Sequence, residues 1–93
     1  MRIYIAGSIK KDPDYAAKFY AAEKYLLCKG YEPVNPAKTY LQDGSYKDYI
    51  DSGLKQLMTC DAIYLLRNWQ ESFGATLEWN YARTVGLKII YQV

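Results

Sequence analysis

The residues best suited to chemistry lie between Trp69 and Glu78, where a polar loop meets a predicted helix. The loop follows an apolar run, Ala62 to Leu66, that is typical of a buried strand. In open α/β sheets, ligands bind beyond the carboxyl ends of the strands. Backbone N–H groups at a helix start also attract phosphate or carboxylate groups. We therefore expect an anion-binding loop followed by Glu78 in the first helical turn, where the positive helix end holds the carboxylate ionised.

Each candidate residue also has an ordinary structural interpretation. Glu78 could be a first-turn acid that only stabilises its helix, and Ser72 could be a helix cap. Tyr4 lies in a predicted strand, where tyrosine is common, and its hydroxyl would seek a partner. Trp69 could pack at a rim, although an aromatic ring beside a pocket also suits stacking on a nucleobase. Ordinary turns would equally explain Gly7, Ser8 and Gly74.

Composition indicates a small globular protein. The chain has 93 residues, 51% of them hydrophobic, and a net charge of +2. Lys10-Lys11 is the only basic doublet, so we expect no nucleic-acid polymer as a partner. No apolar run approaches the roughly 20 residues of a membrane span, and we expect no membrane partner and a cytoplasmic location. A core this small favours a homodimer or a higher homo-oligomer.

Cysteine and histidine usage argues against metal chemistry. The sequence contains no His, and Cys28 and Cys60 lie far apart with no CxxC motif. A zinc site or a catalytic Cys–His pair is therefore effectively excluded, and we interpret both cysteines as small core residues. We expect neither a metal nor another cofactor.

The pattern of apolar residues and turn signals predicts strands alternating with helices over one domain, residues 1–93. The predicted strands are Arg2–Ala6, Tyr31–Val34, Asp61–Leu66 and Lys88–Tyr91. The predicted helices begin at Asp12-Pro13, Ser45 and about Gly74, and end at Gly30, before Asp61, and at Gly86. This order implies an α/β fold, a three-layer parallel sheet of the flavodoxin or Rossmann type with about four strands and three helices.

Three loops should meet at one edge of such a sheet. They are residues 7–11, the long loop around residues 36–45, and residues 67–73. Parallel strands present their carboxyl ends on the same side, so these loops converge on one candidate site. In the last of them, Asn68 and Trp69 precede Ser72 and are candidate substrate contacts.

The chain resembles the nucleoside 2-deoxyribosyltransferase superfamily over nearly its whole length. The resemblance rests on the segments R-I-Y-I-A-G-S-I (residues 2–9), C-D-A-I-Y-L-L (residues 60–66) and S-F-G-A-T-L-E (residues 72–78), with Ala82 and Gly86 after the last. The chain looks similar to a small, poorly characterised bacterial and phage branch with the pattern W-x-x-S-x-G-A-x-x-E. The next neighbour is the 2'-deoxynucleoside 5'-phosphate N-hydrolase branch.

The resemblance implies a role for each matching residue. Glu78 matches the nucleophile that attacks the anomeric carbon, and Tyr4 matches the tyrosine that positions it. The loop that holds the 5'-phosphate in the hydrolase branch matches Ser72 and Gly74. The loop that lines the substrate pocket matches Gly7, Ser8 and Ile9. The implied function is cleavage or transfer at the N-glycosidic bond of a 2'-deoxynucleoside or its 5'-monophosphate.

One position departs from the family pattern. The family usually carries an Asp on the second helix that assists the departing base, and Gly53 stands there. Asp51 lies two residues away, about 200° around a helix, and should face elsewhere. The departure leaves open a non-catalytic module that captures or senses a nucleotide, whereas a bare interaction domain would leave the converging loops unexplained. If the missing acid limits turnover, Gly53→Asp should raise base release, provided that the backbone tolerates the side chain.

Overall fold

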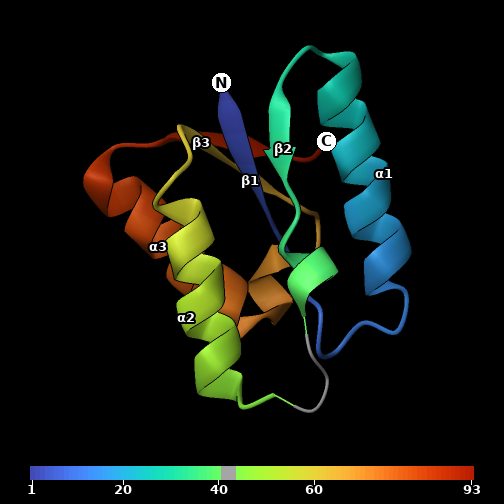
Figure 1. Cartoon of the computed structure of the whole chain (residues 1–93), viewed down its shortest axis with the longest axis vertical. Helices are drawn as coiled ribbons and strands as arrows, with labels where there is room; N and C mark the ends of the chain where they lie inside the picture. The colour runs from blue at the N-terminus through green and yellow to red at the C-terminus, as the bar shows by residue number, and fades with distance from the viewer. Residues whose placement is uncertain (41–43) are drawn as a thin grey trace.

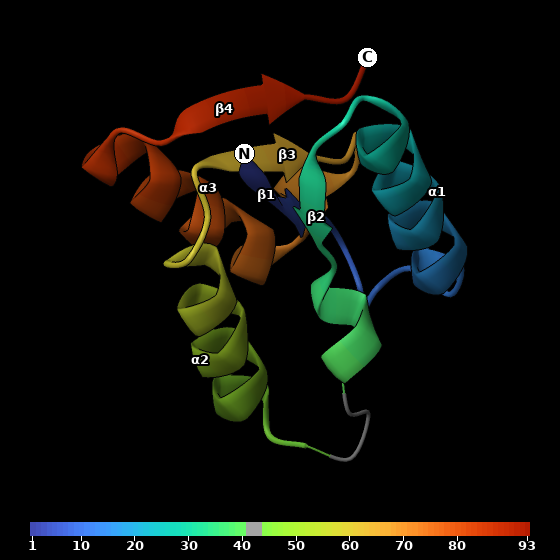
Figure 2. The same cartoon turned by 45° about the horizontal axis from the view of Figure 1, so that its top comes forward.

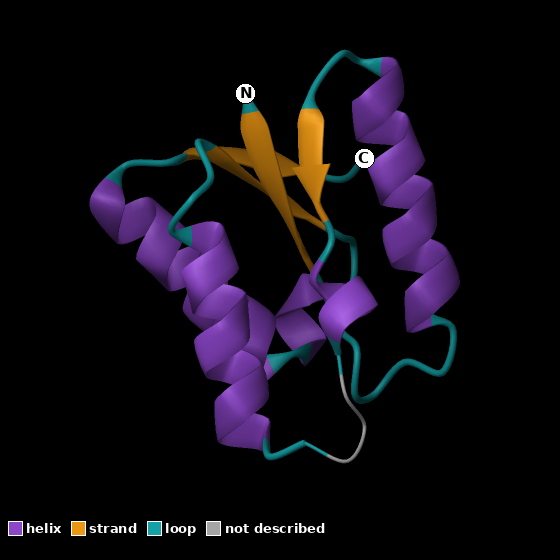
Figure 3. Ribbon diagram, viewed as in Figure 1, coloured by secondary structure: helices purple, strands orange, loops and turns teal. Residues whose placement is uncertain are grey.

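Four parallel strands form the centre of the protein. The computed structural model describes residues 1–40 and 44–93. The strands are β1 (Arg2–Ala6), β2 (Glu32–Val34), β3 (Ala62–Leu65) and β4 (Lys88–Tyr91), in the spatial order β2-β1-β3-β4 (Figures 1 and 3). β1 pairs with both β2 and β3, so it lies inside the sheet, flanked on each side.

Among the described residues, three α-helices cover the two faces of this sheet. They are α1 (Tyr15–Cys28), α2 (Tyr46–Leu57) and α3 (Phe73–Val85). Figure 2 shows α1 on one side of the sheet and α2 with α3 on the other. The predicted three-layer α/β fold with a parallel sheet is therefore confirmed.

Residues of β1 alternate between the two hydrophobic layers, as the period of a strand requires. Ile3 and Ile5 pack with α1, where Phe19 and Leu26 complete the layer. Tyr4 and Ala6 face the other way, among residues of α2 and α3. The side chain of Tyr4 is thus directed into the layer that also contains the buried face of α3.

The connections reverse direction between β1 and β3. The helix α1 leads from β1 outward to β2, whereas α2 returns across β1 to β3 on the opposite face. The loop after β1 therefore leads to one face of the sheet and the loop after β3 leads to the opposite face, although the two strands are neighbours. Such a switch point is where open α/β sheets bind their ligands.

Helix starts and ends follow the expected chemistry, with small corrections. Ser45 accepts a hydrogen bond from the backbone N–H of Asp48, which caps α2 as predicted. Gly86 ends α3 in the left-handed conformation at φ +84°. The helix α1 begins at Tyr15, later than predicted, because the Asp12 side chain accepts from Asp14 N and forms a turn first.

Two further predictions need correction. Cys28, the last residue of α1, is exposed, so only Cys60 is a core cysteine. The loop predicted over residues 36–45 contains the 3₁₀ helix η1 (Pro36–Thr39), which Asn35 caps by accepting from Ala37 N. Residues 41–43 of that predicted loop lie outside the described residues. None of the helices in the described chain has the length and apolar character needed to cross a membrane.

Candidate active site

A buried pair of side chains, Glu78 and Tyr4, lies at the centre of the candidate site. Glu78 projects from α3 toward the sheet and is 5% exposed, while Tyr4 in β1 is fully buried. The Tyr4 hydroxyl donates a hydrogen bond of 2.5 Å to Glu78 Oε2. Among the described residues, Glu78 Oε1 has no hydrogen-bond partner, so one carboxyl oxygen is fixed and the other is available.

Burial changes the acid–base behaviour of this carboxyl group. Desolvation raises the pKa of Glu78 from 4.5 to about 8, and the hydrogen bond from Tyr4 opposes the shift only in part. The prediction that the helix start holds Glu78 ionised is wrong, because Glu78 lies beyond the first turn of α3, which contains no acidic residue. Burial, together with the nearby Glu78 charge, raises the pKa of Tyr4, which therefore stays a hydrogen-bond donor.

Gly53 brings the backbone of α2 against the buried pair. A Cβ atom at this position would lie 2.6 Å from Glu78 Oε2 and 2.9 Å from the Tyr4 hydroxyl oxygen. The position therefore points into the site, and any side chain there would force Glu78 or Tyr4 to move. Because that movement would disturb the hydrogen-bonded pair, Gly53→Asp should not raise base release. Asp51 pairs with Lys47 at 2.6 Å, away from the pair.

A pocket of about 240 Å³ opens between the loop after β1 and the start of α3, and we call it the loop pocket. Its lining is Ser8, Ile9, Lys10, Lys11, Tyr46, Tyr49, Ser72 and Phe73. Ser72 caps α3 by accepting from Ala75 N at 3.1 Å, and among the described residues its own O–H has no acceptor, so it can donate to a ligand. Ser72 therefore caps α3, as its ordinary structural interpretation predicted, and also lines the pocket.

Two lysines at this pocket were not among the predicted site residues. Lys10 Nζ lies 5.1 Å from the ring centroid of Tyr46, and Lys11 Nζ lies 5.2 Å from that of Phe73. Cation–π contact holds both ammonium groups at the pocket edge. In the sequence they form an isolated basic doublet, which usually marks only a solvated surface.

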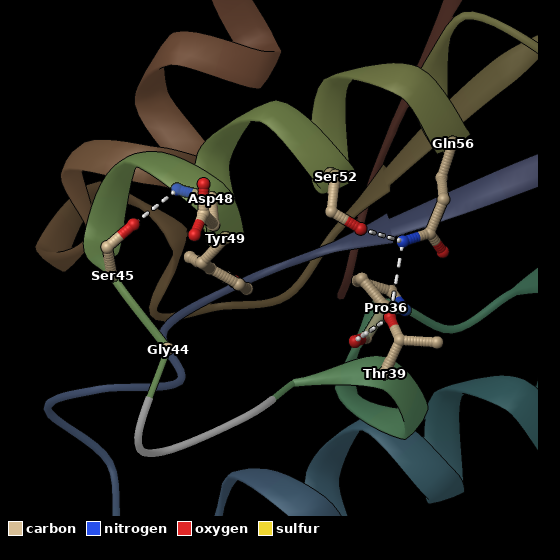
Figure 4. Close-up of a pocket in the computed structure, with 9 residues that line it drawn as sticks. Pro36, Thr39, Gly44, Ser45, Asp48, Tyr49, Ser52 and Gln56 are labelled. Atoms are coloured by element: carbon tan, nitrogen blue, oxygen red, sulfur yellow. Dashed lines mark hydrogen bonds between the residues drawn. The ribbon is translucent and has the colours of Figure 1, made fainter.

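A second pocket of about 240 Å³ lies between α2 and η1, and we call it the helix pocket (Figure 4). Its lining is Pro36, Thr39, Gly44, Ser45, Asp48, Tyr49, Ser52, Gly53 and Gln56. The Gln56 amide donates to Thr39 Oγ1 at 3.3 Å and to Ser52 Oγ at 3.2 Å, which links α2 to η1. Tyr49 belongs to both pockets, and Gly53 joins this one to Glu78.

The remaining predicted site residues support the site from outside the pocket linings. A Cβ at Gly7 would lie 2.7 Å from Leu66 Cδ1, and one at Gly74 would lie 2.9 Å from Ile50 Cδ1. Both glycines therefore permit close packing.

Asn68 and Trp69 are placed in a similar supporting way. Asn68 accepts from Ser8 N and donates to Asp12, so it ties the loop after β3 to the loop after β1. Trp69 packs against Trp79, with ring centroids 5.2 Å apart, and against Tyr91. Within the described residues, no group of three or more Cys, Asp or Glu side chains is arranged to hold a metal ion.

Comparison with solved structures identifies the type of fold. The structure is similar to a 2-deoxyribosyltransferase from the psychrotolerant bacterium Bacillus psychrosaccharolyticus, with a TM-score of 0.76 and 16% identity over 98% of this chain. It is also similar to a 2-deoxyribosyltransferase from Leishmania mexicana, with a TM-score of 0.75 and 23% identity over 97% of this chain. The protein has a nucleoside 2-deoxyribosyltransferase-like fold.

The family itself carries no assigned activity. Residues 1–91 match the model of the domain of unknown function DUF4406, and the chain belongs to that family. It spans 71% of the Bacillus protein and 62% of the Leishmania protein. No curated protein matches the sequence.

The raised pKa of Glu78 makes a prediction about stability. The folded state holds the Glu78 proton up to about pH 8, whereas the unfolded chain releases it near pH 4.5. Between these values the folded state binds more protons, so the free energy of unfolding should fall as pH rises. Glu78→Gln, which has no proton to lose, should remove this part of the slope. Urea denaturation at several pH values between 5 and 8, roughly one unit apart, measures it.

Glu23 provides the matched control for this experiment. It is the other buried acid among the described residues, but its bond with Lys38 lowers its pKa. Glu23→Gln should therefore keep the slope between pH 5 and 8. An equal slope in Glu78→Gln and the unmodified protein would contradict the assignment of a raised pKa to Glu78.

Proposed function

We propose that this protein cleaves or transfers at the N-glycosidic bond of a 2'-deoxynucleoside or its 5'-monophosphate, with Glu78 as the nucleophile. The observation that carries the proposal is the buried Glu78, with one oxygen held by Tyr4, directly behind Gly53 in the wall of the helix pocket. A carboxylate fixed in this way can react through its second oxygen. The similarity to two 2-deoxyribosyltransferases supports the same chemistry.

The reaction would proceed in two steps. Glu78 Oε1 attacks the anomeric carbon, the bond to the base breaks, and its electron pair leaves with the base. The covalent sugar ester that forms is then attacked by water, giving hydrolysis, or by a second base, giving transfer. Because a 2-deoxy sugar lacks the electron-withdrawing 2-hydroxyl, positive charge develops at this carbon more easily. The chain supplies the nucleophile, and the proposal requires no cofactor.

Burial gives Glu78 two properties that bear on this reaction. A desolvated carboxylate is a stronger nucleophile toward a carbon that becomes positive, because less bound water must be displaced. Only the ionised form reacts, however, and a pKa of about 8 leaves much of Glu78 protonated at neutral pH. Base release should consequently increase as pH rises toward 8.

The loop pocket suits the phosphate end of a nucleotide. The Ser72 hydroxyl and the first N–H groups of α3 can donate to phosphate oxygens. Lys10 and Lys11 add two positive charges at the same opening. We therefore propose a preference for the 5'-monophosphate over the free nucleoside.

As part of the same proposal, residues 1–93 act as one domain within a homo-oligomer. Phe73, which is 77% exposed beside this pocket, is available for subunit contact.

A second candidate function is nucleotide binding without turnover. The observation that favours it is the pair of features that weaken catalysis, the absence of a side chain at Gly53 and the raised pKa of Glu78. A protein of this kind would bind the 5'-monophosphate through the same loop pocket. It would release no base at any pH, which separates the two functions experimentally.

Replacing Glu78 tests the nucleophile directly. Glu78→Gln keeps an oxygen that can accept from Tyr4, so the fold should survive while base release falls to background. The assay is chromatography of free base after incubation with a panel of 2'-deoxynucleosides and their 5'-monophosphates at pH 8. Glu23→Gln is the control and should retain activity. Undiminished base release by Glu78→Gln would remove Glu78 from the mechanism.

The phosphate preference makes a separate prediction for the lysines. Lys11→Met should weaken binding of a 5'-monophosphate about tenfold, the scale of one partly exposed charge-assisted contact, and should leave binding of the free nucleoside unchanged. Calorimetry with both ligands measures the difference. Lys24→Met is a matched control, since Lys24, like Lys11, lies over an aromatic ring, that of Tyr20, but on α1. Equal affinity of the unmodified protein for nucleoside and monophosphate would contradict the assignment.

A further inference from the structure

The departing base needs a hydrogen-bond donor that position 53 cannot supply. A Cβ at Gly53 already approaches Glu78 Oε2 to 2.6 Å, so a longer side chain there would displace the nucleophile itself. A donor on α2 must therefore come from the neighbouring turns of the same helix face. Four other residues of α2 line the helix pocket together with Gly53: Asp48, Tyr49, Ser52 and Gln56. Ser52 and Asp48 lie about 100° and 140° around the helix from Gly53, whereas Tyr49, one turn earlier, and Gln56, one turn later, share its helix face.

Of these two side chains, only Tyr49 has a free donor. The Gln56 amide nitrogen already donates to Thr39 and Ser52. The Tyr49 hydroxyl has no hydrogen-bond partner among the described residues. Its ring is held edge-on against Tyr40, with centroids 5.1 Å apart, and also lies 6.3 Å from Tyr46. A rigid ring with an unused O–H is well suited to meet a ligand atom.

Tyr49 also occupies the boundary that a bound nucleotide would cross. It lines the loop pocket, where the lysines lie, and the helix pocket, which contains hydroxyl and amide groups. If the phosphate lies at Lys10 and Lys11, the base extends past Tyr49 toward α2. Burial, followed by the charge of Glu78, raises the pKa of Tyr49, so its O–H stays protonated at neutral pH.

We propose that Tyr49 donates its hydroxyl proton to the departing base, in place of an acidic residue on α2. This inference rests on the proposed function. As the glycosidic bond breaks, its electron pair passes to the base nitrogen, which takes the proton of Tyr49 while Glu78 bonds to the anomeric carbon. The phenolate then accepts a proton from the water that attacks the same carbon and releases Glu78. The net products are the protonated base and the free sugar phosphate.

The test compares two leaving groups in Tyr49→Phe. An ordinary 2'-deoxynucleoside 5'-monophosphate needs a proton on its base, whereas 4-nitrophenyl 2-deoxyriboside 5-phosphate releases a stable anion that needs none. Tyr49→Phe should lower kcat for base release about 10²-fold, as expected for loss of a general acid, with little change in KM. Release of 4-nitrophenol should be nearly unchanged. Tyr15→Phe is the control, because Tyr15 belongs to the same row of rings, against Tyr40, but lines neither pocket.

Each result decides a different question. An equal loss on both substrates would make Tyr49 a structural residue and would overturn the inference while leaving the proposed function intact. No loss on either substrate would also overturn it. Failure of the unmodified protein to release either leaving group at pH 8 would overturn the proposed function itself, and the inference with it. If Tyr49→Phe does not fold, 3-fluorotyrosine at position 49, a stronger acid of nearly the same shape, should sustain or raise base release, and a large loss would contradict the role.

Discussion

The burial of one carboxyl group constrains most of this structure. Glu78 lies between α3 and the sheet, where an unpaired carboxylate is costly, and it responds by holding its proton to about pH 8 and by accepting a hydrogen bond from Tyr4. Tyr4 must then face α3 from the middle of β1, and α2 must come close enough to cover the pair. Gly53 allows that approach because any Cβ would meet Glu78. The hydrogen bond between Tyr4 and Glu78 therefore requires Tyr4 to face α3 and requires α2 to lie close to the pair.

The same constraint explains how the site could work. Covering Glu78 with bare helix backbone excludes water from one carboxyl oxygen but places no acid beside it. The helix α2 instead presents Tyr49 and Gln56 from the turns on either side of Gly53. Binding at such a site is divided between a positively charged side at Lys10 and Lys11 and an uncharged side formed by α2 and η1. A nucleotide has the same division, with an anionic end and a neutral base.

The helices and strands could be predicted well from the sequence, whereas the burial and ionisation of Glu78 could not. The strand Arg2–Ala6 and the caps at Ser45 and Gly86 were predicted from local signals, and the structure confirms them. The pairing of Tyr4 with Glu78 was expected only through resemblance to a family, since 74 positions separate the two residues. Nothing local to Glu78 indicated its burial, and the helix-start argument gave the wrong ionisation. Likewise, the lysine doublet became a site feature only when the fold placed it beside Ser72.

If Glu78 is the nucleophile, it forms a covalent bond to the sugar during the reaction. The direct measurement is mass spectrometry of the protein after incubation with a 2'-deoxy-2'-fluoroarabinonucleoside 5'-monophosphate, whose fluorine slows hydrolysis of the sugar ester. We expect an added mass equal to the fluorinated sugar phosphate on the peptide that contains Glu78, and no addition in Glu78→Gln. Saturating binding of the analogue without any added mass, or an adduct on another residue, would contradict the assignment of Glu78 as the nucleophile.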